Sequence, residues 1–457
     1  MLRRIRFSRL IGLAALAGTL LAPAAWAQGQ AEEVALLREQ VRLLTDKVKQ
    51  LEDRMQPPPT AASTGTLAAA DPLPKPAVLA VSDRSVSFSS GDGLAVIRLR
   101  GLLQVDSRSF FSDAGIRGND TFLIRRARIS LEGSFNRLFQ FQIVPDFAGA
   151  SATLVNANVT AAFSPAFQVR LGKFKTPVGI EQIQADPTNA FLERAHPSNL
   201  MPGFDIGLQA GGDLAGGLVR YTVGVFNALP DSGTLPNADS DDEKGLVARV
   251  MLRPGGGLEV GLGATYSPNL TAASSLGGGY RTDGQQRYFA YDVGTTASGD
   301  GWRITPQAAL YRGAFGAMAE FVVSAIEVQS AATRAELQHQ AWHVMASYVL
   351  TGENASYTGV VPRRSFNLAE GNWGSFEVTA RAAGIELDAD TFPTFASGRT
   401  NASEVTSFGL GLNWYLSAGM RFMADYLQSD LSSVQPTTSP LITAGEKTLM
   451  TRLQLIF

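Results

Sequence analysis

Apolar and polar side chains alternate with a period of two over most of the chain, from about residue 83 to residue 457. Because successive side chains of a β-strand point to opposite faces, this pattern predicts strands that each have one apolar and one polar face. Clusters of Gly, Asn, Asp and Pro separate about sixteen or seventeen such segments. Several neighbouring segments form predicted hairpins, among them 301–313 with 315–327 and 403–415 with 418–428. The pattern therefore predicts an all-β body.

The polar face of these segments carries Arg, which a soluble sheet could not bury in its core. In segment 94–108, for example, Arg98 and Arg100 alternate with Ile97 and Leu99. An apolar outer face and a charged inner face are what lipid outside and water inside require. We therefore predict a transmembrane antiparallel β-barrel of about 16 strands over residues 83–457. A soluble β-sandwich is the alternative.

Turn lengths and the C-terminus favour the membrane barrel. Short turns such as 417–418 alternate with long connections such as 231–243 and 429–446, as the periplasmic turns and outer loops of such barrels do. The last segment, 449–457, alternates in the same way and ends on Phe457. A final strand with a terminal aromatic residue resembles the assembly signal of bacterial outer-membrane proteins.

The first 27 residues have the features of a secretory signal peptide. Arg3, Arg4, Arg6 and Arg9 precede an apolar stretch, and Ala25-Trp26-Ala27 forms a small-x-small cleavage site. The apolar stretch is about 13 residues long, whereas a membrane-spanning helix needs about 20. We therefore expect an exported protein whose mature chain begins near Gln28.

Residues 28–56 have the spacing of a coiled coil. Their apolar positions alternate in steps of three and four: Val34, Leu37, Val41, Leu44, Val48, Leu51 and Met55. This heptad pattern predicts a helix that pairs with copies of itself, and Val at a with Leu at d favours two strands. A single amphipathic helix lying on the protein's own surface is the alternative. Residues 57–82 are rich in Pro, Ala, Ser and Thr, and predict an extended linker.

Composition excludes several classes of site. The chain of 457 residues has no Cys, so it has neither disulfides nor a Cys-based zinc site. A net charge of −2 argues against nucleic acid as a partner. Only His196, His339 and His343 are present, which argues against a His-rich metal site, and we expect no metal and no cofactor.

An enzyme is also not expected. His339 and His343 share one face of a predicted strand near Ser347, the arrangement that a hydrolase alternative would need. The chain has no Gly-x-Ser-x-Gly sequence, so we interpret these two His as solvated side chains of the barrel lumen.

Several stretches resemble the phosphate-selective porin family, of the porin O and porin P type. They are FLIRRARISLEG (122–133), LGKFKTPVGIEQ (171–182), FLERAHPSNLMPGFDIGLQ (191–209), AWHVMASYVLTGE (341–353), GNWGSFEVTAR (371–381), GLGLNWYL (409–416) and the segment 449–457. The resemblance implies a sixteen-stranded trimeric channel of the outer membrane, and several members favour anions such as phosphate. Related porins have a periplasmic coiled coil, so the resemblance implies three helices rather than two.

Arginine suits an anion pathway because its planar group binds two oxygens and stays charged. The predicted inner face carries Arg98, Arg100, Arg108, Arg126, Arg128, Arg170, Arg220, Arg303 and Arg381. Acidic residues share this face: Asp106, Glu132, Asp146, Glu320 and Glu377. The alternative is that these charges pair across strands and only hold the wall. Transport of anions requires a surplus of Arg at the narrowest point.

We expect the narrowest point in residues 175–205, a long segment with four Pro that is too apolar to extend into water. In the family that the chain resembles, the third long loop folds into the barrel. Lys173, Lys175 and Arg194 are therefore predicted to contact anions there, with Arg126 and Arg128 on the wall. Glu181, Asp186 and Glu193 dilute this positive charge.

The sequence thus predicts an outer-membrane porin of a Gram-negative bacterium for passive diffusion of small anions, phosphate or related. The expected partners are the lipid bilayer, two further copies in a homotrimer, and small anions. The alternative is a general or other-solute porin whose helix, in the periplasm, also tethers the outer membrane to the peptidoglycan of the cell wall.

Overall fold

The computed structural model describes residues 42, 46–47, 76–111, 118–227, 230–231, 242–437 and 439–457. Residues 42, 46 and 47 are helical. The chain divides into two units, residues 1–73 and 74–457, and the second unit contains the whole β-sheet. The predicted signal peptide, nearly all of the predicted coiled coil and most of the predicted linker lie outside the described residues.

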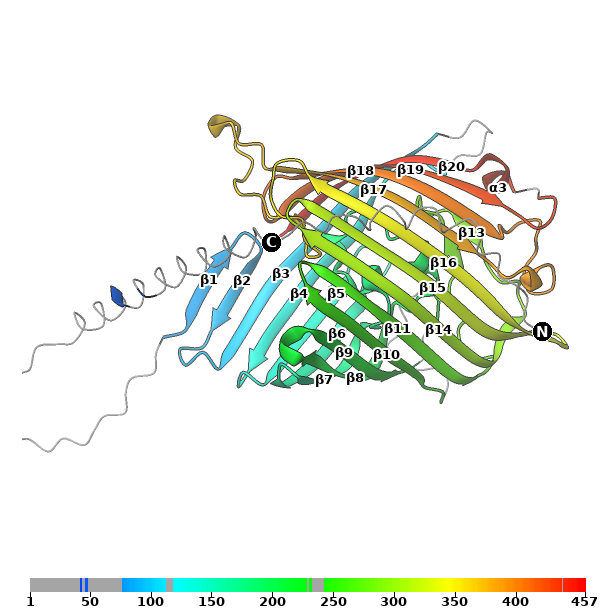
Figure 1. Cartoon of the computed structure of the whole chain (residues 1–457), viewed down its shortest axis with the longest axis horizontal. Helices are drawn as coiled ribbons and strands as arrows, with labels where there is room; N and C mark the ends of the chain where they lie inside the picture. The colour runs from blue at the N-terminus through cyan, green and yellow to red at the C-terminus, as the bar shows by residue number, and fades with distance from the viewer. Residues whose placement is uncertain are drawn as a thin grey trace, which may run out of the picture. The chain divides into compact units, whose positions relative to one another are not determined.

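Sixteen antiparallel strands form a closed barrel (Figure 1). Each strand pairs with the next along the chain, and the last one, β20, pairs with β3 to close the ring. The barrel strands are β3 (Ala95–Phe110), β4 (Thr121–Phe135), β5 (Phe139–Asp146), β6 (Thr153–Ser164), β7 (Phe167–Lys175), β8 (Phe204–Leu214), β9 (Val219–Phe226), β10 (Gly245–Gly255), β11 (Leu258–Leu270), β14 (Thr295–Arg312), β15 (Phe315–Ser330), β16 (Thr333–Val349), β17 (Ser375–Glu386), β18 (Glu404–Tyr415), β19 (Met420–Ser432) and β20 (Glu446–Ile456). The predicted fold class is confirmed.

A β-hairpin precedes the barrel. Strands β1 (Val78–Ser82) and β2 (Ser85–Ser89) pair with each other across a two-residue turn, and β2 also pairs with the start of β3. The predicted boundary at residue 83 differs from the structure here, because β1 lies in the range expected for the linker and the closed ring begins at Ala95. The period-two sequence of residues 85–89 gives β2 a strand pattern beside β3.

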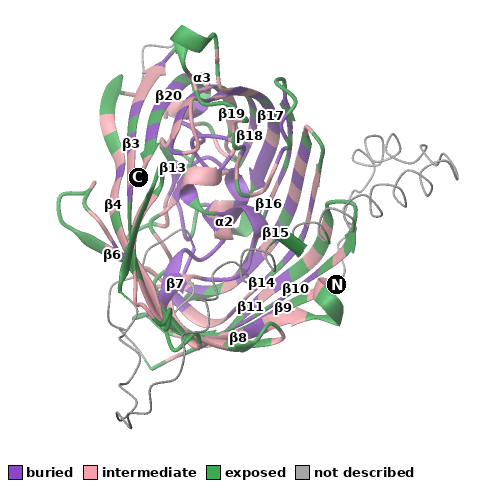
Figure 2. Cartoon of the chain, turned by 90° about the vertical axis from the view of Figure 1, so that its left-hand side faces the viewer, coloured by how far each residue is buried: buried purple, intermediate pink, exposed green. Residues whose placement is uncertain are grey.

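The barrel is apolar outside and polar inside. On β4, Ile124 and Ile129 are 53% and 48% exposed, whereas Arg126 is 5% exposed. On β16, Val344 is 54% exposed and the adjacent His343 is 1% exposed. Figure 2 shows the same alternation of burial along the strands. This is the inversion that lipid outside and a polar interior require, and it agrees with the sequence pattern.

The two ends of the barrel differ in their connections. At the end where β20 finishes, most turns are short, such as 136–138, 165–166 and 313–314, and the opposite end carries most of the long loops. The connections on either side of β16 are exceptions. Residues 331–332 make a two-residue turn at the long-loop end, and residues 350–374 make a long segment at the short-turn end.

The connection between β7 and β8, residues 176–203, lies inside the barrel and is named the inner loop below (Figure 2). It contains α2 (Ile180–Ile183) and two 3-10 helices, η2 (Asp186–Thr188) and η3 (His196–Leu200). Its apolar side chains are almost completely buried, among them Phe191 and Leu200. Packing of these side chains against the interior wall holds the loop in the barrel.

Other connections contact the inner loop from both ends. On the long-loop side, β12 (Tyr280–Arg281) and β13 (Arg287–Phe289) form a small hairpin, and the Asn199 side chain makes two hydrogen bonds with the Arg281 backbone. From the other side, the Tyr357 hydroxyl donates to the Ile180 carbonyl over 2.6 Å. The remaining short helices lie in turns and loops: η4 (Ala215–Gly217), η5 (Leu368–Glu370), η6 (Ala389–Thr391) and α3 (Pro440–Ala444). No helix among the described residues is both long and apolar enough to cross a membrane.

Candidate functional site

Four arginines of the barrel wall hold the backbone of the inner loop. Each donates to a loop carbonyl over 2.8–3.0 Å: Arg303 to Leu200, Arg381 to Glu193, Arg421 to Asn189 and Arg452 to Leu192. They come from β14, β17, β19 and β20, and we name them the anchor arginines. The Arg381 guanidinium also lies over the Phe191 ring, 4.4 Å from its centroid. One side of the wall is therefore committed to positioning the loop.

Glycines on the wall let the loop approach closely. A Cβ at Gly263 of β11 would lie 2.4 Å from the Val178 carbonyl oxygen, and one at Gly409 of β18 would lie 3.0 Å from a Phe191 ring carbon. The first distance is too short for any side chain, and the second requires the ring to move. Small residues at these wall positions thus complement the shape of the loop.

Asp186 of the inner loop collects four cations. Lys175, Arg126 and Arg194 lie 3.1, 3.2 and 2.6 Å from its carboxylate oxygens. Arg128 also contacts Asp186 and binds Asp146 over 2.7 Å. We name these four cations and two carboxylates the Asp186 network. Its charges, all counted as ionised, leave two positive charges in excess.

Glu193 forms a second network beside the first. Arg125 binds it with two hydrogen bonds of 2.6 and 3.0 Å, and Arg108 lies 3.1 Å away. Arg452 lies 3.5 Å from Glu193 and binds Asp106 over 2.7 Å. These three cations and two carboxylates, the Glu193 network, leave one positive charge in excess.

The loop carboxyls of both networks stay ionised. Burial alone would raise the pKa of Asp186, but Arg126, Lys175 and the other cations hold this pKa well below its usual range. Burial likewise opposes ionisation of Glu193, and the Arg125 and Arg452 guanidinium groups lower its pKa. Nearby opposite charge outweighs desolvation in both cases. These two carboxylates therefore keep their negative charge at neutral pH.

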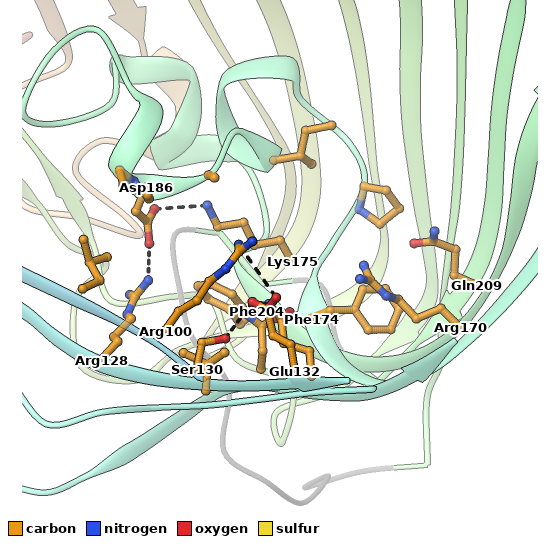
Figure 3. Close-up of a pocket in the computed structure, with 18 of the residues that line it drawn as sticks. Arg100, Arg128, Ser130, Glu132, Arg170, Phe174, Lys175, Asp186, Phe204 and Gln209 are labelled. Carbon is orange, nitrogen blue, oxygen red and sulfur yellow. Dashed lines mark hydrogen bonds and ion pairs between the residues drawn. The ribbon is translucent and has the colours of Figure 1, made fainter. Parts of the chain in front are cut away.

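Two cavities meet at the Asp186 network. The inner cavity, about 570 Å³, is lined by residues near the end of the chain, such as Ile456, and the outer cavity, about 290 Å³, by residues of the β12–β13 hairpin, such as Arg281. Both are lined by Arg128, Lys175, Asp186 and Phe204. Figure 3 shows Asp186 between Arg128 and Lys175 at this junction.

The inner cavity holds arginines without a carboxylate partner. Among the described residues, Arg170 and Arg249 form no ion pair with an acid. Arg170 lies over the Phe174 ring at 4.9 Å, and Arg249 donates to Gln307 over 3.0 Å. Arg100 is weakly paired, because its guanidinium nitrogen lies 3.8 Å from a Glu132 carboxylate oxygen and its side chain is 43% exposed. Guanidinium groups without a close carboxylate keep their field for an ion in the cavity.

Comparison with known protein families identifies the family to which this barrel belongs. The family model for phosphate-selective porin O and P matches residues 97–457. The chain belongs to this porin family. It is therefore an outer-membrane porin of the Gram-negative type, a channel protein and not an enzyme.

Solved porin structures share the fold of this porin at low sequence identity. The outer membrane channel DcaP of Acinetobacter baumannii is 10% identical, with a TM-score of 0.53 over 81% of this chain and 99% of that one. An anion-selective porin from Comamonas acidovorans is 12% identical, with a TM-score of 0.52 over 79% and 100%. OmpT of Vibrio cholerae is 12% identical, with a TM-score of 0.50 over 80% and 98%. No curated protein matches the sequence.

The porin brings together four of the predicted pathway residues. Arg126, Arg128, Lys175 and Arg194 all contact Asp186. Arg100, Arg128, Arg170 and Arg220 line the inner cavity, and Arg98 lines an adjoining hollow that shares Arg170. Arg220 is also paired with Asp213, at 2.8 Å. The predicted loop 175–205 corresponds closely to the inner loop.

Three predicted pathway residues lie elsewhere in the porin. Arg303 and Arg381 line neither cavity and are anchor arginines, because the inner loop covers their stretch of wall. Arg303 is also paired with Asp231, at 2.6 Å. Lys173 is 3% exposed and lines neither cavity; its register partners are Ala157 and Ile206.

Several charged residues of the porin's site were not predicted. Strict alternation places Arg125 on the outer face, but a register shift opposite Gln104 and Val105 turns it inward, where it lines the outer cavity. The adjacent pair Arg125-Arg126 was the available signal, since two consecutive charges cannot both face inward on a regular strand. Arg452 lies on the polar face of the last strand, whereas the prediction for this strand used its apolar face and its terminal Phe457.

Proposed function

We propose that this porin passes small anions, phosphate or related oxyanions, by passive diffusion through the junction of the inner and outer cavities. The observation that carries the proposal is the positive excess at this junction. In the Asp186 network, four cations share one carboxylate, and among the described residues only Arg128 has a second acidic partner. A passing anion therefore meets cationic groups whose charge is only partly neutralised, whereas a cation is repelled.

The inner cavity supports the same direction of selectivity. Arg170 and Arg249 face an ion there without a competing acid among the described residues. Phe174 and Gln307 hold their guanidinium groups in place. A planar group held in advance loses little entropy when it binds two oxygens of a phosphate. Guanidinium groups at such sites favour an oxyanion over a spherical anion.

We further propose that three chains assemble through a coiled coil of residues 28–56 in the periplasm, after a signal peptide at 1–27 is removed. Residues 57–77 would link this helix to the β1–β2 hairpin. The unbroken heptad spacing supports self-association. The second candidate role, a tether to peptidoglycan, depends on the same helix. Deletion of residues 28–82 separates the two roles: loss of cell-wall binding with unchanged conductance supports a tether, and loss of the trimer alone does not.

Reversal potentials in planar bilayers test the selectivity. In a tenfold KCl gradient we expect the sign that reports faster chloride movement, and added phosphate should reduce the chloride current by occupying the junction. A reversal potential at zero or of the opposite sign contradicts anion preference.

Charge reversal at the junction locates the selectivity. The Arg126→Glu, Arg128→Glu double variant changes the Asp186 network from two positive to two negative charges, so the anion-to-cation permeability ratio should fall by about tenfold or invert. Arg126→Gln with Arg128→Gln, a milder change, should give an intermediate ratio. The control is Arg137→Glu, an exposed residue of the β4–β5 turn. An unchanged ratio in a folded double variant refutes the assignment.

A further inference from the structure

Two carboxylates and an imidazole meet where the inner loop contacts β15 and β16. Glu181 belongs to the inner loop, Glu320 to β15 and His343 to β16. One ligand atom from each lies within 4.8 Å of the other two. The three residues are 6%, 4% and 1% exposed, and none of them lines the inner or the outer cavity. The group is thus buried and separate from the proposed anion pathway.

The His343 ring is buried without a hydrogen bond. Neither ring nitrogen has a hydrogen-bond partner, although Nε2 lies 3.4 Å from a Glu320 carboxylate oxygen, Oε2. Buried polar groups almost always have a partner, and each exception requires an explanation such as a bound ion. A cation bound between the His343 ring and the two carboxylates would give a ring nitrogen the partner that it lacks.

Backbone groups orient the two carboxylates toward the ring. The Ala195 N–H donates to Glu181 Oε2 over 2.9 Å, and the Ile180 N–H donates to Glu320 Oε1. Glu181 Oε1 and Glu320 Oε2 remain. Among the described residues, the only Lys or Arg paired with the Glu181 carboxylate is Arg381, 3.8 Å from Oε1. Arg381 is in turn 3.0 Å from Asp283. Among the described residues, therefore, no nearby cation neutralises both carboxylates.

We propose that Glu181, Glu320 and His343 bind one divalent transition-metal cation, with Zn²⁺ as the representative ion. Two carboxylates and one imidazole suit Zn²⁺, Mn²⁺ or Fe²⁺, whereas Ca²⁺ and Mg²⁺ take oxygen ligands in larger number. Ligand atoms at most 4.8 Å apart need only a small contraction to reach a common ion. The sequence argued against a His-rich site, and this one needs a single His.

The bound ion would fix the inner loop to the wall. Glu181 lies five residues before Asp186 in the loop, so a metal crosslink to β15 and β16 restrains the segment that presents Asp186 to the anion pathway. The proposal does not depend on anion selectivity, because the ligands lie outside both cavities. Either proposal can fail while the other stands.

Metal content measures the site directly. The full chain, folded in detergent from chelator-treated buffer, is dialysed against ZnCl₂ and then against metal-free buffer, and zinc is counted by mass spectrometry. We expect about one Zn²⁺ per chain for the native protein and under about 0.1 for His343→Gln, because a three-residue site rarely retains the metal with two ligands. Equal zinc in both proteins overturns the proposal.

His339→Gln is the matched control. His339 lies four residues earlier on β16 and is also buried, but its ring is satisfied by the Tyr291 hydroxyl at 2.9 Å and the Asp388 N–H at 3.0 Å. This variant should keep its zinc. Loss of zinc in both His variants indicates a general effect on the fold and overturns the assignment to His343.

Two measurements on the native protein alone test the proposal if His343→Gln does not fold. Co²⁺ added to the metal-free native protein should produce visible absorption bands of a nitrogen- and oxygen-ligated site at one equivalent, and Zn²⁺ should abolish them. The native melting temperature should rise with Zn²⁺ and return with EDTA, because a ligand that binds only the folded state stabilises it. Absence of the bands and of the temperature shift means that His343 and the carboxylates form an ion pair without metal.

Discussion

The two sides of the barrel wall have the same alternating sequence pattern, yet their arginines play different roles. On the covered wall, strands β14–β20, the anchor arginines donate to carbonyls of the inner loop. On the open wall, strands β3–β10, the arginines line cavities, as Arg100, Arg170 and Arg220 do. The side of the barrel against which the loop packs decides whether an inward Arg is structural or faces the cavities.

Burial explains why the two roles differ in energy. The side chains of Arg381 and Arg452 are 1% exposed, whereas that of Arg220 is 48% exposed. A buried cation whose partner is removed, or a buried acid left alone, costs several kcal/mol, and an exposed ion pair contributes little. The anchor arginines should therefore control stability, whereas exposed arginines of the open wall, such as Arg220, should contribute little to it.

The largest expected difference is in stability. Arg303→Leu removes the pair with Asp231 and the hydrogen bond to the Leu200 carbonyl, and it leaves the Asp231 carboxylate buried. The free energy of unfolding in detergent should fall by about 3–5 kcal/mol. Arg220→Leu, which breaks an exposed pair with Asp213, should lower it by about 0–1 kcal/mol. Urea titration followed by tryptophan fluorescence measures both values.

Equal losses of stability in the two variants would contradict the division of the wall. A folded Arg303→Leu variant also allows a second measurement, since a loop with one anchor fewer should fluctuate more. Its single-channel current should therefore be noisier than that of Arg220→Leu under the same conditions.

A smaller effect is expected on conductance when one open-wall Arg loses its charge. Arg170→Gln removes a cation that lines the inner cavity without an acidic partner among the described residues. Conductance should fall by about twofold near 0.01 M salt, where the Debye length is about 30 Å, and should not change near 1 M, where it is about 3 Å. Arg137→Gln in the exposed β4–β5 turn is the control. A decrease that persists at high salt indicates a change of pore shape instead.

The fold could be predicted from the sequence because alternation is a local property. The hairpins 301–313 with 315–327 and 403–415 with 418–428 appear as β14–β15 and β18–β19. The roles of individual arginines could not be predicted in this way. Arg303 and Arg381 alternate with apolar residues in the same way as Arg170 and Arg220. Only the packing of the inner loop decides that the first two hold the loop and the last two line the inner cavity.

Other features depended on contacts between distant segments. The register shift that turns Arg125 inward arises from pairing between β3 and β4. Likewise, the segment 350–374 lies at the end with short turns, yet it is long, and its Tyr357 hydroxyl donates to the inner loop. Turn lengths alone cannot show that a connection folds back into the barrel.

The smallest effect is expected from pH, and it concerns the open wall. The cations hold the pKa values of Asp186 and Glu193 below their ordinary ranges, and Arg stays charged at any working pH. Titration of Asp186 and Glu193 should therefore make no contribution to any change of the permeability ratio between about pH 8 and about pH 5. Because the folded-state values are depressed, the stability that these carboxylates contribute is complete above their unfolded values, about 3.9 for Asp and about 4.3 for Glu. It should be lost only as the pH falls below about 4 and through the folded-state values.

Asp186→Asn provides the reference for this prediction, because it mimics a protonated Asp186 and raises the excess of the Asp186 network from two charges to three. Its anion preference should exceed that of the native porin at every pH from about 8 to about 5. Reversal potentials at pH 8, 6 and 5 compare the two proteins. If the native protein and Asp186→Asn differ at pH 8 but have the same ratio at pH 5, the Asp186 carboxylate titrates in this range, and its charge is then set by the solution rather than by the surrounding cations.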